Sequence, residues 1–304
     1  MRHTAFDPNL LSAAADKKWW AAWKKKADSA TADAIKIWEN KGQNLPGDGY
    51  RSDIWGELKQ WLLENYFHKR CAYCQVSLER HDSDAEHFRP KGRVRVQNKD
   101  GLLAQVKVKI KVGRKTDTHP GYFWLAYTWQ NLVPCCSECN GGKSDQFPVN
   151  ASHCAEPQKD RAKDADVEMT PYRSVRHKGH YYLLPEELDK RENAMLLNPM
   201  FDNPRSCIRF QPKGFVKALD ARGSETVKVC RLDTDGLRGR RQNQQENLNR
   251  KFCMASGDAT SPEEKLDKCR RVLASYLAGN EDFSEAALDF LDTMTGEDVR
   301  AKYL

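Results

Sequence analysis

The chain has 304 residues, enough for one large domain or two small ones. Hydrophobic residues make up 39% of it and the mean hydropathy is −0.81, so it is polar but can still form a core. No apolar run approaches the length of a membrane span, and the first 25 residues hold lysines where a signal peptide has an apolar stretch. The net charge of +7 and the pI of about 8.8 favour a polyanionic partner. These features predict a cytoplasmic protein with no membrane partner, whose ten cysteines stay reduced.

The chain is predicted to begin with a helical region, residues 1–69. Apolar residues recur at helical spacing over residues 10–41 and again over residues 53–69, with a loop at Asn44–Tyr50 between them. The second helix runs directly into the first cysteine pair, so we expect it to buttress that pair.

Three tryptophans, Trp19, Trp20 and Trp23, lie among lysines on the first predicted helix. Such a pattern could form a stacking surface for nucleic acid. Tryptophans on a helix belong more often to a core or an interface. We therefore expect these three side chains to pack inside the protein.

Two C-x-x-C pairs follow, Cys71 with Cys74 and Cys136 with Cys139, separated by 61 residues. Each pair places two sulfurs on one tight turn, and four thiolates make a closed structural zinc site. Cys135 could substitute for Cys136, although only Cys136 has the C-x-x-C spacing to Cys139. Buried free cysteines or a redox pair would be the alternative, but a redox pair does not need a matched second pair. The sequence therefore predicts structural Zn²⁺ held by the four cysteines.

The segment between and just after these pairs carries polar residues that could do chemistry: Glu86, His87, Arg89, Lys91, Asn131, Asn140 and Lys143. Taken singly, each has an ordinary explanation, such as a surface histidine, a turn asparagine or a solvated basic strand. Their joint order around the two cysteine pairs favours a functional site.

This ordered set resembles the HNH nuclease family, the ββα-metal endonucleases, in its zinc-stapled form. In that family an acid–His pair is followed by Asn-Leu and then by C-x-x-C-[His or Asn]-x-x-Lys. The resemblance extends over about Cys71–Pro148 and includes HPGYFWLAYTW at His119–Trp129. It implies an α+β fold, with a ββα-metal core over residues 70–150 flanked by helices and by a mixed extension over residues 151–304.

The resemblance also implies a role for each polar residue in phosphodiester hydrolysis, which needs an activated water and a cation on the scissile phosphate. His87 would be the general base, and Asn131 would hold the loop that orients it. Glu86 and the side-chain oxygen of Asn140 would bind Mg²⁺ or Mn²⁺. Substrate contacts would come from three basic residues, Lys143, Arg89 and Lys91.

Two positions depart from the commonest family pattern. The family more often has Asp where Glu86 stands, and often has His where Asn140 stands. Both residues still offer oxygen ligands to a cation, and Asp84 is a possible substitute ligand.

Val94–Val112 contains the alternating stretch VKVKIKV at Val106–Val112, which predicts a strand with one exposed face. Paired with Arg93–Val96 it could form a hairpin that grips the phosphate backbone near the site. An ordinary amphipathic ribbon would give the same pattern, so both readings stay open.

Beyond a charged, irregular stretch at Asn150–Arg176, short antiparallel strands are expected at Ile208–Phe210 and Gly214–Leu219. The stretch from Glu225 should run as a strand or turn into a long helix that begins near Asp233. Two more helices are predicted: one capped by Ser261 with Pro262 in its first turn, and one over Ser284–Met294. These terminal helices could dock a partner, but closing their own core is the commoner use of such helices.

The order of these C-terminal elements resembles a narrower group, the PtuB-type HNH nucleases of Septu antiphage systems. The resemblance implies a partner, an ABC/SMC-like ATPase of the PtuA type, and some such pairs are attached to retrons. Nucleic acid would be the substrate: HNH sites cut DNA in most families, which makes DNA the expected substrate, and ββα-metal chemistry is also compatible with RNA.

Two other interpretations remain open. A zinc-stapled nucleic-acid-binding or adaptor module without turnover would need the cysteines and the basic strand, but not the full polar set. A nuclease could also stay silent until a partner ATPase responds.

Overall fold

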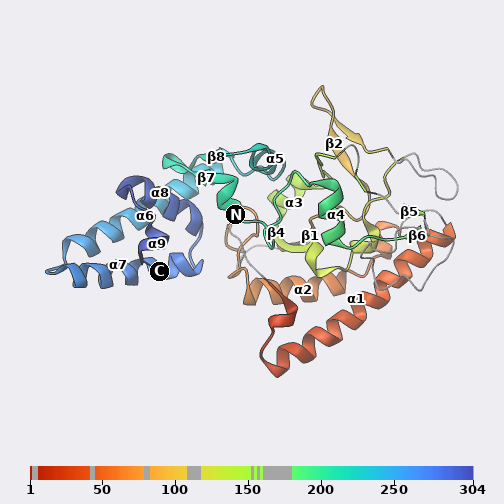
Figure 1. The fold of residues 1–304 in the computed structure, drawn as a ribbon, viewed down its shortest axis with the longest axis horizontal. Coiled ribbons are helices and arrows are strands. Elements are labelled where there is room, and N and C mark those ends of the chain that lie inside the picture. The colour runs from red at the N-terminus through yellow and green to blue at the C-terminus, as the bar shows by residue number, and fades with distance from the viewer. Residues whose placement is uncertain are drawn as a thin grey trace.

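The structure is a computed structural model of the chain, and it describes residues 1, 6–41, 45–78, 83–107, 118–151, 154–155, 158–159 and 180–303. Within these ranges the fold is α+β, as expected: helices are combined with four separate two-stranded antiparallel sheets. The helices of residues 235–303, α6–α9, gather at one end of the molecule, away from strands β1 (Ser83–His87) and β4 (Leu132–Cys136) (Figure 1). None of the described helices is long and apolar enough to cross a membrane.

The two predicted N-terminal helices are confirmed as α1 (Ala14–Lys41) and α2 (Ser52–Asn65). Ile54, Leu58 and Leu62 recur every four residues on α2 and are at most 1% exposed. The helix α2 contacts both strands of the central sheet, which explains this apolar side. The helix α1 begins later than predicted, because a 3₁₀ turn at Pro8–Leu10 leaves Leu10 exposed before it.

The tryptophans of α1 lie against aromatic residues of the same core, so the packing expectation is confirmed. Trp23 is 2% exposed and donates its indole N–H to the Ile54 carbonyl at 2.9 Å. Trp19 stacks on Trp61 of α2, with ring centroids 4.7 Å apart. These contacts tie α1 to α2 and leave no tryptophan of α1 as a free stacking platform in this part of the chain.

The central sheet consists of β1 (Ser83–His87) and β4 (Leu132–Cys136), paired antiparallel so that Ser83 faces Cys136 and His87 faces Leu132. The helix α3 (Ser137–Lys143) follows β4 directly and contacts both strands. Two strands and one helix therefore bring the Glu86–His87 pair, the second cysteine pair and Lys143 into one unit.

A second ribbon, β2 (Arg95–Gln97) with β3 (Leu103–Gln105), projects from the body of the molecule (Figure 1). A hairpin forms within Val94–Val112, with its turn at residues 98–102, but the strand that pairs with Arg95–Gln97 is Leu103–Gln105 and not the predicted VKVKIKV stretch. Pairing extends to Val106, whose amide donates to the Val94 carbonyl. The rest of the VKVKIKV stretch, from residue 108, lies outside the described residues.

Most of the charged stretch Asn150–Arg176 also lies outside the described residues, apart from residues 150–151, 154–155 and the short strand β5 (Gln158–Lys159), which pairs with β6 (His180–Tyr181). The helix α4 (Pro185–Glu192) follows and was not predicted. Proline in a first turn and a left-handed asparagine after a last turn are common at helix ends, so Pro185 and Asn193 could have indicated this helix.

The predicted short strands are confirmed as β7 (Ile208–Phe210) and β8 (Val216–Ala218). The strand or turn expected from Glu225 is wrong, because residues 221–229 form the helix α5 (Ala221–Val229). Asp220 caps it by accepting a hydrogen bond from the Gly223 amide at 2.7 Å. Gly223, Thr226 and Val229 are buried at a spacing of three, so packing overrides the strand preference of the valines.

The C-terminal helices match the expectations closely. They are α6 (Asp235–Gly257), α7 (Pro262–Ala278), α8 (Ser284–Thr295) and the short α9 (Val299–Tyr303). Ser261 caps α7 by accepting from the Glu264 amide, as predicted. These helices share a core of their own, built around Leu248, Leu273 and Leu288.

The largest core crosses all three regions predicted from the sequence. It joins Leu58 of α2, Cys74 of the first cysteine pair and Leu232 of the C-terminal extension. The division at residues 69 and 150 stays a prediction, and the packing of this core ties the three regions to one another.

Gly214 sits in a 3₁₀ turn (Pro212–Gly214) with φ of +72°, and a Cβ there would meet the Arg238 carbonyl oxygen at 2.1 Å. We expect Gly214→Ala to lower the free energy of unfolding by about 2–4 kcal/mol, measured by chemical denaturation. Gly236→Ala on the neighbouring helix α6 is the control, because a Cβ there meets nothing within 4 Å. A Gly214→Ala variant as stable as Gly236→Ala would contradict this account of the turn.

Candidate functional site

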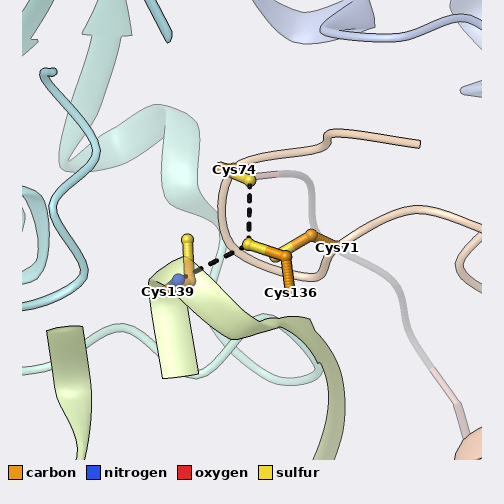
Figure 2. A group of neighbouring side chains, drawn as sticks. All are labelled: Cys71, Cys74, Cys136 and Cys139. Carbon is orange, nitrogen blue, oxygen red and sulfur yellow. Dashed lines mark hydrogen bonds between the residues drawn. The ribbon is translucent and has the colours of Figure 1, made fainter. Parts of the chain in front are cut away.

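The four predicted zinc ligands converge. Cys71 and Cys74 lie on the turn after α2, Cys136 ends β4 and Cys139 lies in α3, and all four sulfurs are within 4.8 Å of one another (Figure 2). The Sγ atoms of Cys74 and Cys136 are 3.8 Å apart. Tetrahedral zinc with Zn–S bonds of 2.3 Å requires sulfurs about 3.8 Å apart. The four buried cysteines can therefore hold a metal such as zinc.

Backbone contacts preshape this cysteine site. The Cys71 amide donates to the Val76 carbonyl and the Gln75 amide donates to the Cys71 carbonyl, which closes the first turn. The Cys139 amide donates to the Cys136 sulfur at 3.4 Å, so Cys136 also caps α3. An N–H that points at a sulfur favours the thiolate that a metal needs.

Cys135 is close but stands apart from the four. Its sulfur lies 3.9 Å from that of Cys71, yet the group of four mutually close sulfurs contains Cys136 instead. Burial raises the pKa of the Cys135 thiol, which keeps it protonated. The spacing argument that preferred Cys136 is thus supported by the geometry.

Beside the cysteine site, a cleft of about 370 Å³ opens where β1 meets α3, and the loop after β1 forms its rim. Its lining includes the predicted residues Glu86, His87, Lys91 and Asn140. Among the described residues, no group of three or more Cys, His, Asp and Glu ligands gathers except the four cysteines. The cleft still offers carboxylate and amide oxygens, the atoms that hard divalent cations prefer.

His87 is 5% exposed and is held in one orientation. Its Nε2 lies 3.0 Å from the Ala126 carbonyl oxygen, and its ring meets the Trp55 ring edge-on with centroids 4.8 Å apart. A carbonyl can only accept, so Nε2 carries the proton and Nδ1 keeps a lone pair. Burial, aided by the positive charge of Lys91, holds the pKa of His87 well below its usual value. The imidazole is therefore neutral near pH 7.

Asn131 ties down the chain just after His87. Its side-chain oxygen accepts from the Arg89 amide at 2.7 Å, and its amide group donates to the Arg89 carbonyl at 3.0 Å and to the Leu125 carbonyl at 3.2 Å. The Asn131 carbonyl accepts from the Phe88 amide. Asn131 is 1% exposed, so these bonds fix the strand end that carries His87.

Two acidic side chains of β1 each contact a side chain of α3. Asp84 and Glu86 share one side of the strand, and Asn140 and Lys143 lie one helical turn apart. Asn140 donates to the Asp84 carboxylate at 2.8 Å, and the Lys143 ammonium lies 2.6 Å from Glu86 Oε1. Burial raises the pKa of Glu86 although the charge of Lys143 opposes the shift.

Lys143 is fully buried and also donates to the His87 carbonyl at 2.8 Å. Its ammonium thus neutralises Glu86 and fixes the end of β1. In this arrangement it has no exposed surface for the phosphate contact expected from the sequence.

Arg89 and Lys91, also expected at the substrate, are placed differently from each other. Arg89 is 2% exposed, and its guanidinium binds Glu192 at 2.9 Å and Asp189 at 2.6 Å, both on α4. Although burial opposes the charged form, these carboxylates hold the pKa of Arg89 above its usual value. Lys91 lines the cleft, with its ammonium 4.6 Å from the centre of the Trp55 ring.

The sequence did not single out the residues that hold this arrangement in place. Trp55 packs against His87 and Lys91, and Glu192 accepts hydrogen bonds from Arg89, from the Tyr122 hydroxyl and from the Ala155 amide. A tryptophan on an amphipathic helix and a glutamate at a helix end carry no motif, so only the tertiary contacts reveal them.

The chain is similar to two curated proteins of Bacillus mycoides (strain KBAB4). It is 27% identical to "Septu protein PtuB" over 204 residues, which cover 66% of this chain and 53% of that protein. It is 22% identical to "Septu protein PtuA" over 177 residues, which cover 58% of this chain and 19% of that protein. The chain thus spans about half the length of the first relative. No protein-family model and no solved structure matches the chain.

We expect the purified chain to contain about one zinc ion, and Cys74→Ser to lose it and unfold the surrounding unit, because structural zinc contributes directly to folding. Elemental analysis and circular dichroism would measure both effects. Cys253→Ser is the matched control, since Cys253 is exposed on α6. A folded Cys74→Ser variant that lacks zinc would exclude a structural role for the metal.

Arg89→Ala should lower the free energy of unfolding by about 3–5 kcal/mol, because it leaves the buried Glu192 carboxylate without its counter-charge. Arg93→Ala breaks an ion pair with Asp145 from a side chain that is 57% exposed, and should cost less than about 1 kcal/mol. Equal losses for the two variants, measured by urea denaturation, would refute the structural role of Arg89.

Proposed function

From the likeness to the Septu proteins and the chemistry of the cleft, we propose that this chain is a metal-dependent endonuclease of the HNH type and a component of a Septu-type antiphage system. One observation carries the proposal. A neutral histidine with Nδ1 unprotonated lies in a cleft beside Glu86, Asn140 and Lys91, next to a four-cysteine site. The arrangement of β1, β4 and α3 supports a ββα-metal core.

His87 would act as the general base of phosphodiester hydrolysis. Its Nε2–H is committed to the Ala126 carbonyl, so Nδ1 is the atom that can take a proton from water. The pKa shift keeps His87 neutral, and hence able to accept that proton, at physiological pH. Asn131 would act as a positioning residue, because it fixes the backbone on the C-terminal side of His87.

Glu86 and the side-chain oxygen of Asn140 would hold Mg²⁺ or Mn²⁺, which would stabilise negative charge on the scissile phosphate. Asn140 already donates its N–H to Asp84, which leaves its oxygen for a cation and keeps Asp84 nearby as an alternative ligand. Lys143 now neutralises Glu86, so a divalent cation would share that carboxylate with it or displace it.

Substrate contacts would come from Lys91 and the exposed Arg93, the cations that line the cleft. Arg89 would support the loop from behind rather than touch the substrate, because its charge is satisfied by α4. Lys143 would order Glu86 and the end of β1. DNA is the proposed substrate, and RNA is the other polyanion that the same chemistry could cut.

The proposed partner is an ABC/SMC-like ATPase of the PtuA type, and a retron could belong to the same assembly. A nuclease of this kind could be silent alone and active only with its ATPase. An adaptor that binds nucleic acid without turnover would need neither the neutral His87 nor its anchoring by Asn131.

Replacing His87 with alanine should reduce cleavage of supercoiled plasmid, in Mg²⁺ or Mn²⁺, by about 10²–10⁴-fold, because no other described side chain in the cleft offers a neutral imidazole. Total RNA should be tested in parallel to identify the substrate. Zinc content should stay unchanged, since His87 is not among the four clustered ligands.

His68→Asn is the matched control, because His68 is exposed outside the cleft and asparagine tolerates its positive φ of 48°. Cleavage by His87→Ala at the wild-type rate would disprove the assigned mechanism. Protein inert toward both substrates, alone and with its ATPase, would instead favour the adaptor.

A further inference from the structure

The β2–β3 ribbon carries two exposed leucines, Leu102 and Leu103, where its turn meets β3. Leu102 is 67% exposed and Leu103 is 39% exposed, while every residue of β3 is exposed. An exposed leucine adds little to stability, and two adjacent ones on a projecting ribbon leave apolar surface in contact with solvent.

The turn that presents these leucines is rigidly built. The Asn98 side chain accepts from the amides of Asp100 and Leu102 at 3.0 and 2.8 Å, and the Asn98 amide donates to the Leu102 carbonyl. Gly101 takes a φ of +80°, which closes the turn without strain. The tip is therefore held in one shape before any ligand binds, which lowers the cost of binding.

The charge of the ribbon indicates what it meets. Over residues 92–107 the basic side chains are Arg93, Arg95, Lys99 and Lys107, against one acidic residue, Asp100. Asp145 binds both Arg93 and Arg95, which anchors the base of the ribbon to the end of α3. Arg93 and Asp145 also line the cleft, so the ribbon is a direct continuation of the candidate active site.

We propose that the β2–β3 ribbon is a DNA-binding arm, whose basic stem follows the phosphate backbone and whose Leu102–Leu103 tip enters a groove of duplex DNA and wedges against a base step. This inference rests on the proposed nuclease function and adds the element that would hold a duplex against the cleft. Apolar side chains that enter a groove can part a base step and bend the duplex, which opens the backbone to an adjacent site.

The test compares binding of a fluorescent DNA duplex by the full chain without added divalent metal, for wild type and for the double variant Leu102→Ala/Leu103→Ala. We expect the double variant to bind about tenfold or more weakly, with an unchanged dependence on salt, because it loses apolar contacts and no charge. Lys99→Ala should instead reduce the salt slope by about 0.9. Energy transfer between dyes at the two DNA ends should report a bend with wild type that the double variant does not produce.

Met254→Ala is the control, since Met254 is 62% exposed on α6, far along the chain from the ribbon. Thermal stability and zinc content check that each variant is folded. A double variant that binds and bends the duplex like wild type would overturn the proposal, and so would wild-type protein that does not bind duplex DNA.

Hydrolysis of bis(p-nitrophenyl) phosphate by wild type and His87→Ala judges the nuclease separately, because this small diester needs the cleft and not the arm. If wild type hydrolyses the diester and the double variant binds duplex DNA as well as wild type, the nuclease proposal stands and the DNA-binding arm is disproved. If duplex binding depends on the two leucines but the diester is not hydrolysed, the DNA-binding arm stands and the nuclease proposal fails.

Discussion

The antiparallel pairing of β1 with β4 is the constraint on which the rest of the site depends. Its register sets Ser83 opposite Cys136 and His87 opposite Leu132. One end of this short sheet therefore leads into the second cysteine pair, and the other joins His87 to the residue just after Asn131. A slip of one residue would turn Glu86 away from α3, because successive side chains point to opposite sides of a strand. A metal among the cysteines would protect this register, since it would fix β4 and α3 to the turn that precedes β1.

A second constraint on the loop after β1 is the pairing of Arg89 with the carboxylates of α4. Arg89 lies among Phe88, Tyr122 and Phe147, with its guanidinium 5.2–5.9 Å from their ring centres, and its charge is met by α4. A buried ion pair of this kind contributes little net stability, but it is costly to break and therefore favours a single arrangement. Asn131 and Arg89 together leave His87 little freedom, which suits a group that must hold one nitrogen toward a cleft.

Much of this could be predicted from the sequence, and the limits have physical causes. The cysteine site followed from local spacing, and the helices α1, α2, α6, α7 and α8 followed from periodicity and caps. The prediction of a strand or turn at α5 was wrong because alternating valines favour a strand, whereas the burial of Gly223 and Thr226 favours a helix. The burial of Lys143 and Arg89 could not be predicted, because a lysine or arginine in a motif has the same appearance whether it meets a substrate or a carboxylate from a distant helix. The carboxylate that holds Arg89 lies 103 residues away, on a helix that was itself not predicted.

The largest core has a consequence for the order in which this protein can be completed. Its apolar residues begin at the N-terminus and include Cys71 and Leu132, yet they end only with Phe283 and Ala286. Arg70, next to the first of the four clustered cysteines, also pairs with Asp282 at 3.3 Å. During synthesis, the chain up to Ala286 must therefore be made before this core can be complete. Until then the nascent chain exposes apolar residues that this core later covers, and such surfaces make partly folded chains prone to aggregate.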